Sequence, residues 1–208
     1  FKQKTAYEML RSLVGSEMCI RDRACPRHVD VPLVARHATR TRDETRRILG
    51  LAPEQPAYLL AFATLDLDES ALKTVETIRE AVFLFKHPLA YKLSNGLCLD
   101  PFDLSYPDVV AACEAVITKP GYGIVSDCLA HGTPIIYTDR GPFPEYPVLV
   151  ETMRKHLPVA YLPSHDLYSG RWAQALSEIR LRSATPGAFR TDGAEVCAQL
   201  ILETLGAL

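Results

Sequence analysis

A glycine-rich loop carries the residue types that bind phosphate. The loop Thr118-Lys-Pro-Gly-Tyr-Gly-Ile-Val-Ser-Asp127 joins an apolar segment of strand type to a segment with helical periodicity. Gly121 and Gly123 allow positive φ and the close approach of a ligand to the backbone, and the N–H groups that open a helix attract an anion. Lys119 adds a positive charge beside them. We therefore predict a phosphate site on this loop.

Asp127 lies one turn inside the predicted helix, on the face away from the apolar residues Val125 and Leu129. Its carboxylate has two plausible roles. It can complement the helix dipole, an effect of a few tenths to about 1 kcal/mol. It can also accept both hydroxyls of a ribose whose phosphates bind the turn above. The residues themselves leave both roles open.

The same loop partly matches the dinucleotide fingerprint. Gly121-x-Gly123-x-x-Ser126, with Asp139 ending the next strand, resembles the G-x-G-x-x-G pattern of NAD-binding proteins. However, Ser126 replaces the third glycine, Lys119-Pro120 separates the strand from the turn, and two strand–helix units precede this strand. NAD therefore ranks third among the ligands considered.

A second polar loop, Asp139–Tyr146, follows the next predicted strand. One glycine and three prolines, counted through Pro147, stiffen its backbone and present Arg140, Glu145 and Tyr146 at the same sheet edge as the first loop. The alternative is an ordinary rigid connection with a surface Glu–Arg pair. Two adjacent polar loops favour a shared pocket.

The segments around these loops alternate between strand and helix patterns. Continuous apolar runs such as Tyr58–Ala63 are typical of strands that are covered on both faces. A strand followed by a helix, repeated about six times, predicts an α/β domain with a doubly wound parallel sheet of Rossmann-like type. The predicted strands are Ala57–Thr64, Val82–Lys86, a short Leu97–Leu99, Ala115–Thr118, Pro134–Thr138 and Val159–Leu162. The predicted helices are Arg42–Leu49, Glu69–Glu80, Pro107–Cys113, Ile124–Ala130, Pro144–His156, Leu167–Leu181 and Gly193–Leu205.

Composition excludes several classes of protein. The 208 residues are 48% apolar and 23% charged, which is typical of a soluble globular domain. No apolar run approaches the roughly 18 residues of a membrane span. Net charge is −2; the first 50 residues hold 11 Lys/Arg against 6 Asp/Glu but lack an aromatic ladder. We therefore expect neither a membrane span nor a nucleic-acid partner.

The cysteines indicate a reducing, cytoplasmic compartment and no metal. They form no C-x-x-C pair, and no histidine lies at zinc-ligand spacing from them. We also expect no cofactor. The six histidines form no recognisable pair with an acid, so no catalytic base can be assigned. The six cysteines are Cys19, Cys25, Cys98, Cys113, Cys128 and Cys197.

Three motifs give a family resemblance. Tyr106-Pro-Asp-Val-Val-Ala-Ala-Cys-Glu114, the glycine-rich loop through Asp127, and Tyr137-Thr-Asp-Arg-Gly-Pro-Phe-Pro-Glu-Tyr146 resemble the donor-binding half of GT-B glycosyltransferases. The sequence is most similar to bacterial proteins related to the peptidoglycan N-acetylglucosaminyltransferase and to the glycosyltransferase-like region of arabinokinases. The resemblance implies one half of a GT-B fold, with a nucleotide-sugar donor as ligand.

The resemblance also assigns roles to residues. It implies that Lys119, Gly121, Tyr122 and Gly123 bind the diphosphate, that Asp127 binds the ribose, and that Arg140, Glu145 and Tyr146 face the sugar. Family members usually carry Glu at the place of Asp127. They also typically end the first strand with Gly-Gly, where this chain has Ala63-Thr-Leu-Asp66. The side chains of Thr64 and Leu65 are therefore expected either to obstruct the donor or to reshape its approach.

Three parts are expected along the chain. Residues 1–23 resemble a translated sequencing-adapter read, hence a non-native leader, and charged residues interrupt its apolar stretch, which excludes a signal peptide. Residues 24–56 are expected to form an interdomain linker and a lead-in helix, opened by a capping box at Thr41 and Glu44. Residues 57–208 form the expected nucleotide-sugar-binding domain. The acceptor domain would precede the linker.

Two main functions remain open. The first is the donor-binding half of a glycosyltransferase that uses a nucleotide sugar, expected to be UDP-linked, and that is inactive without its acceptor domain. The second is a non-catalytic module that senses a sugar nucleotide and is associated with a sugar kinase, which the absent Gly-Gly favours. A nucleotide-sugar epimerase on the same fold ranks third.

Overall fold

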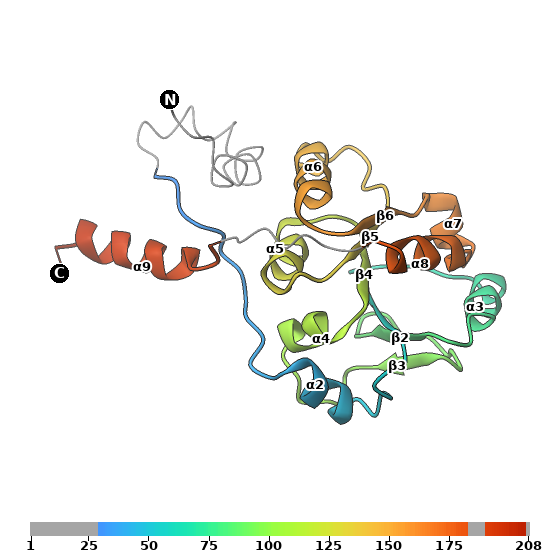
Figure 1. Cartoon of the computed structure of the whole chain (residues 1–208). Helices are drawn as coiled ribbons and strands as arrows, with labels where there is room; N and C mark the ends of the chain where they lie inside the picture. The colour runs from blue at the N-terminus through green and yellow to red at the C-terminus, as the bar shows by residue number, and fades with distance from the viewer. Residues whose placement is uncertain (1–28, 183–189, 207–208) are drawn as a thin grey trace.

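The computed structural model describes residues 29–182 and 190–206, and Figure 1 shows their arrangement around one central sheet. The predicted leader, residues 1–23, lies outside the described residues. The sheet has six parallel strands in the order β3-β2-β1-β4-β5-β6, which confirms the doubly wound Rossmann-like prediction. The strands are β1 Ala57–Ala61, β2 Val82–Phe85, β3 Gly96–Cys98, β4 Ala115–Thr118, β5 Ile135–Tyr137 and β6 Val159–Tyr161.

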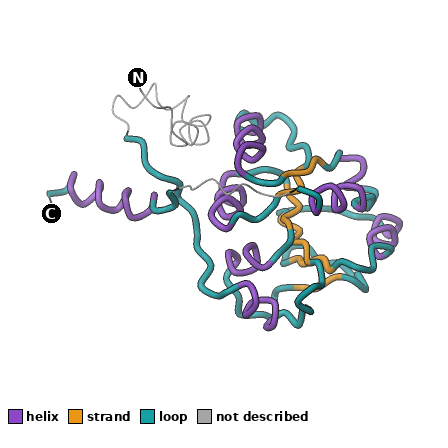
Figure 2. Tube along the Cα trace, in the orientation of Figure 1, coloured by secondary structure: helices purple, strands orange, loops and turns teal. Residues whose placement is uncertain are grey.

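Helices cover both faces of the sheet (Figures 1 and 2). One face packs against α2, α4, α5 and α6, and the other against α3, α7 and α8. Within the described residues, no helix is long and apolar enough to cross a membrane. The helices are α2 Arg42–Ile48, α3 Glu69–Glu76, α4 Tyr106–Ala112, α5 Tyr122–His131, α6 Tyr146–His156, α7 Ser164–Tyr168, α8 Ala173–Arg180 and α9 Gly193–Thr204.

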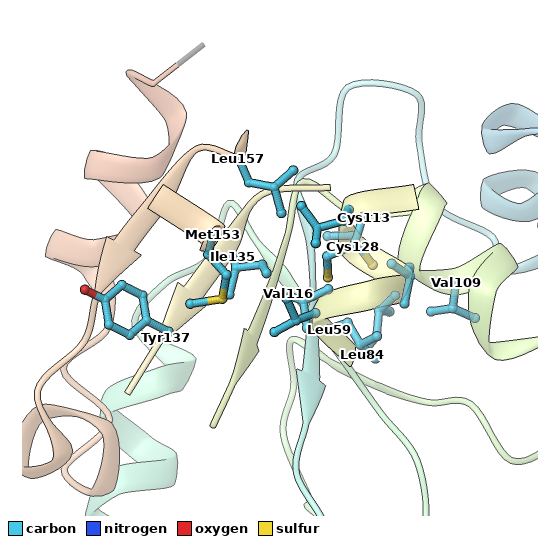
Figure 3. Packing of buried hydrophobic residues seen from close by; sticks show 14 of the residues in the cluster. Leu59, Leu84, Val109, Cys113, Val116, Cys128, Ile135, Tyr137, Met153 and Leu157 are labelled. Atoms are coloured by element: carbon cyan, nitrogen blue, oxygen red, sulfur yellow. The ribbon is translucent and has the colours of Figure 1, made fainter. Parts of the chain in front are cut away.

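The apolar strands supply two separate cores because their side chains alternate between the faces. In β1, Leu59 belongs to the core under α4, α5 and α6, whereas Tyr58 belongs to the core under α3 and α8. Figure 3 shows Leu59 with its neighbours in the first core. In the second, the fully buried Trp172 contacts the Phe83 ring edge to face at 5.0 Å between centroids. The continuous apolar runs follow from this burial on both faces.

One helix prediction was wrong. The sequence predicts a single helix over Leu167–Leu181, but the chain ends α7 at Tyr168 and begins α8 at Ala173. Gly170 causes the break, since its φ is +75° and a Cβ there would lie 2.3 Å from the carbonyl oxygen of Ala71 in α3. The glycine both turns the chain and permits close contact with α3.

An extended segment, residues 29–41, precedes α2, and we call it the strap. Val34 of the strap forms an isolated antiparallel bridge with Asp192, directly before α9. A Cβ on Gly193 would lie 2.1 Å from the Pro32 carbonyl oxygen, so this crossing requires glycine. The predicted capping box at Thr41 and Glu44 is confirmed at the start of α2.

Helix α9 lies apart from the sheet and its covering helices (Figure 1). Gly193 is the one described α9 residue that is buried. The apolar side chains of Ile201 and Leu202 are 59% and 43% exposed, and Leu205 directly after the helix is 74% exposed. This helix therefore has an apolar surface that the described part of the chain leaves uncovered.

Candidate functional site

The predicted phosphate loop lies at the switch point of the sheet. Successive strands run outward from β1 in one direction and from β4 in the other, so the carboxyl ends of these two neighbours bound a crevice. Thr118 Oγ1, at the end of β4, donates a hydrogen bond of 2.7 Å to the Ala61 carbonyl oxygen at the end of β1. The loop therefore starts from the position where ligands bind in open α/β sheets.

The loop leads directly into α5, as predicted, but its glycines do not adopt positive φ. Gly121 precedes the helix in an extended conformation, with φ −141° and ψ 155°, and Gly123 is the second helical residue. Among the described side chains, none caps this helix start. Its first N–H groups therefore remain available to an anion.

The two glycines differ in what surrounds them. A Cβ added to Gly121 would lie 2.7 Å from Nη1 of Arg140. A Cβ added to Gly123 would meet no heavy atom of the described chain within 4 Å. Gly121 thus makes room for Arg140, and Gly123 leaves the helix backbone open for the close approach of a ligand.

Arg140 joins the two polar loops. Its Nη1 donates a 2.6 Å hydrogen bond to the Pro120 carbonyl oxygen, and its guanidinium carbon lies 3.9 Å from the centre of the Phe143 ring. The alternative of a surface Glu–Arg pair is thus wrong, because Arg140 pairs with the glycine-rich turn. The shared placement of the two loops is confirmed, and a second cation stands at the phosphate loop.

Lys119 is held at the edge of the site by α7. Its Nζ lies 3.1 Å from the Tyr168 hydroxyl and 5.7 Å from the centre of that ring. Tyr168 is 42% exposed, so this contact is open to solvent. The ammonium can therefore turn toward an anion at α5 at small cost.

Glu145 and Tyr146 lie deeper than an exposed loop predicts. Glu145, the residue before α6, is buried, and Tyr146 opens the helix. Burial raises the pKa of the Tyr146 hydroxyl, so it remains a neutral donor at physiological pH. Their role toward a sugar stays a prediction.

Asp139 fixes the second loop to its neighbours. Its carboxylate accepts hydrogen bonds from the Tyr161 hydroxyl, 2.8 Å, and from Ser164 Oγ, 2.9 Å. Burial acts to raise the pKa of Asp139, but these hydrogen bonds outweigh it and hold the pKa below its usual value. The carboxylate that the dinucleotide fingerprint would use is therefore occupied by β6 and α7.

Asp127 is buried and paired with a residue that the sequence did not identify. Arg36 of the strap donates from Nη2 to Oδ2 at 2.5 Å, and from Nε and its backbone N to Oδ1 at 3.4 Å each. The Asp127 side chain is 2% exposed and that of Arg36 is 61% exposed. Because 91 positions separate the two residues, no local spacing indicates this ion pair.

The expected obstruction at the end of β1 is smaller than the sequence predicts. Leu65 is buried in the second core, and its carbonyl oxygen accepts a hydrogen bond from the Tyr91 hydroxyl. The expectation that the Leu65 side chain obstructs the donor is wrong, because it points into the core. Thr64 remains exposed at this edge.

A separate cavity of about 670 Å³ lies around the edge strand β6. Its described lining contains none of the predicted site residues. Its charged groups pair locally, as Arg171 with Asp166 at 2.7 Å. The switch point, where the predicted site residues lie, remains the candidate site.

The amino-acid sequence is similar to part of a plant protein. No family model matches the chain. The chain is 29% identical over 186 residues to an L-arabinokinase of Arabidopsis thaliana, covering 85% of this chain and 17% of that protein. It therefore spans about a sixth of the length of this curated relative.

Solved glycosyltransferases share the architecture. The structure of CalG4, the calicheamicin glycosyltransferase, matches with a TM-score of 0.50 and 13% identity, over 73% of this chain and 38% of that one. Glycosyltransferase VinC in complex with DTDP matches with a TM-score of 0.49 and 16% identity, over 71% and 36%. The resemblance to GT-B glycosyltransferases is thus confirmed for the fold, and this chain has the Rossmann-like fold of one half of such an enzyme.

Proposed function

We propose that this chain is the donor-binding half of a glycosyltransferase and that it binds a nucleotide sugar with UDP as the nucleotide. The observation that carries the proposal is the open backbone at Gly123, at the start of α5 and at the switch point of the sheet. The diphosphate lies against this helix start, where the N–H groups and the helix dipole favour negative charge. Lys119 and Arg140 supply the neighbouring cations.

The sugar extends from the diphosphate toward the second loop. Arg140 bridges the two loops, so a group attached to the phosphate passes close to Glu145 and Tyr146. The hydroxyl of the half-buried Tyr146 and the carboxylate of Glu145 have the hydrogen-bonding capacity to orient sugar hydroxyls.

Transfer requires a second domain, which holds the acceptor. The uncovered apolar side chains of α9 and its end, Ile201, Leu202 and Leu205, support a partner surface there. The match to CalG4 covers 38% of that chain. Because orientation of both substrates contributes several kcal/mol to the barrier, we expect this chain alone to transfer no sugar.

A second candidate is a non-catalytic module that senses a sugar nucleotide. The similarity to an L-arabinokinase favours it, because that relative is named a kinase and is far longer than this chain. Ala63 and Thr64 in place of Gly-Gly also favour it. Both candidates need the same nucleotide site, so they differ only in the step after the nucleotide sugar has bound.

Calorimetric titration of the full chain tests the shared site. We expect UDP to bind more tightly than ADP, NAD or inorganic diphosphate. Equal binding of all four would leave a general anion site and reject nucleotide recognition. A preference for NAD would reject the sugar-nucleotide proposal, and absence of any binding would mean that the glycines serve only the turn.

A transfer assay separates the two candidates. The full chain is incubated with a labelled UDP-sugar, alone and together with a separately produced domain encoded directly upstream in the genome. Transfer that appears only with the upstream domain supports the glycosyltransferase. Tight UDP-sugar binding with no transfer in either mixture, and with a kinase domain encoded downstream, supports the sensor.

A further inference from the structure

We propose that Arg36 is a latch on Asp127 that the ribose of a nucleotide must displace, which makes Arg36 a specificity-determining residue of the site. The inference rests on the proposed nucleotide function. It concerns a strap residue that reaches α5 from 91 positions away along the chain.

The latch lies on the ligand-facing side of α5. Asp127 follows Gly123 by four positions, so both residues lie on one helical face, separated by roughly 6 Å along the axis. At Gly123 this face is open, with no described heavy atom within 4 Å of an added Cβ. At Asp127 the same face is closed by Arg36. A molecule that binds its phosphate at Gly123 and extends along the face meets this ion pair.

Asp127 is inaccessible while Arg36 is bound. Its side chain is 2% exposed, and the guanidinium contacts both carboxylate oxygens. The Arg36 side chain is itself 61% exposed, and its guanidinium carbon lies 5.6 Å from the centre of the Tyr106 ring. The guanidinium can therefore leave toward solvent, whereas Asp127 cannot follow it.

The strap does not depend on Arg36 for its attachment. The Ala38 backbone N–H donates to Nε2 of His131 at 2.9 Å. The backbone N–H groups of Thr39 and Arg40 donate to Asp108 Oδ1 at 2.7 and 2.9 Å. These anchors remain when Asp127 exchanges partners, so release of the Arg36 guanidinium and of its backbone N–H from Asp127 leaves the rest of the strap in place.

The chemistry of the exchange gives selectivity. A carboxylate that loses Arg36 needs new hydrogen-bond donors, because a buried unpaired charge is costly. A ribose diol offers two hydroxyl donors. Ionised inorganic diphosphate accepts hydrogen bonds and is negatively charged like Asp127, so it cannot replace Arg36. Binding of UDP is therefore coupled to the latch, and binding of inorganic diphosphate is not.

The test is a calorimetric cycle on the full chain, with Arg36→Gln and Asp127→Asn singly and together. Since displacement of the cation no longer opposes binding, we expect Arg36→Gln to tighten UDP by about tenfold. Inorganic diphosphate should bind both proteins equally. In the Asp127→Asn background, Arg36→Gln should leave the affinity for UDP unchanged. UDP that binds Arg36→Gln no more tightly than the unmodified chain would overturn the latch.

A second measurement avoids dependence on the folding of the variant. In the unmodified chain, hydrogen exchange of the Arg36 backbone N–H should become faster when UDP binds and stay unchanged with inorganic diphosphate, while Ala38 stays protected. Slower exchange of Arg36 with UDP would reject displacement. If UDP binds the unmodified chain but neither signature appears, the latch alone fails. If UDP binds no protein of the series, the proposed function fails and the latch with it.

Discussion

Substitution of Gly123 should separate stability from nucleotide binding. The residue occupies the second position of α5, and an added Cβ meets no described atom within 4 Å. Gly123→Ala therefore removes backbone entropy from the unfolded chain without a clash and should stabilise the fold by up to about 1 kcal/mol. For a domain of this size that corresponds to a rise in Tm of roughly 2–4 °C. The same methyl group occupies the space where phosphate oxygens would pack.

Binding should change in the opposite direction. We expect Gly123→Ala to weaken UDP by about tenfold, or 1.4 kcal/mol, and the larger Gly123→Val to abolish measurable binding. Calorimetry gives the affinity and thermal unfolding gives the stability. Gly132→Ala is the matched control, because Gly132 ends the same helix with φ +66°. It should lower Tm and leave UDP binding intact. A folded Gly123→Val protein that binds UDP normally would refute the site.

Three further predictions address the site and the scaffold. Lys119→Ala should weaken UDP by about 1–3 kcal/mol, whereas Tyr168→Phe, which removes only the neutral partner, should not; equal effects in the titration would reject a charge contribution. Asp108→Asn should lower stability at neutral pH by about 1–3 kcal/mol, measured by urea unfolding. Burial acts to raise the Asp108 pKa, but hydrogen bonds from Ser105, Arg40 and Thr39 hold it well below its usual value. This stabilisation is present above the unfolded pKa of about 3.9 and fades as pH falls below it, so the two proteins should converge in acid; a constant difference would contradict the assignment. Trp172→Ala should lower the free energy of unfolding by about 3–5 kcal/mol in the same assay, because it leaves a cavity in the second core beside Phe83.

The fold was largely predictable because local signals and tertiary structure agree. Apolar runs identified every strand of the sheet, and β4 matches its predicted bounds of Ala115–Thr118. The signals at helix starts were equally local, as in the capping box of α2. The failure at Gly170 has a tertiary origin, since the glycine is required by the Ala71 carbonyl oxygen of another helix. No pattern within α7 or α8 contains that contact.

The position of the candidate site was predictable from the sequence, but the partners of its charged residues were not. The order of strands and the loop after β4 placed Lys119 and Gly123 at one edge. The pairs Arg36–Asp127 and Arg140–Pro120 depend on how distant segments cross. Asp127 was predicted as a carboxylate on the polar face of α5, and its burial follows from the strap.

The end of β1 bears on the choice between transferase and sensor. The Leu65 side chain lies in the second core, and the Tyr91 hydroxyl donates a hydrogen bond to the Leu65 carbonyl oxygen. Ala63 and Thr64 are therefore the residues that place side chains at this edge where family members typically have Gly-Gly. Both are exposed, and each adds a Cβ to the edge that borders the switch point. Such groups reduce the space beside the phosphates, while the start of α5 and its cations remain accessible. Nucleotide binding is thus compatible with either function, and the choice between them depends on whether the bound sugar is then transferred.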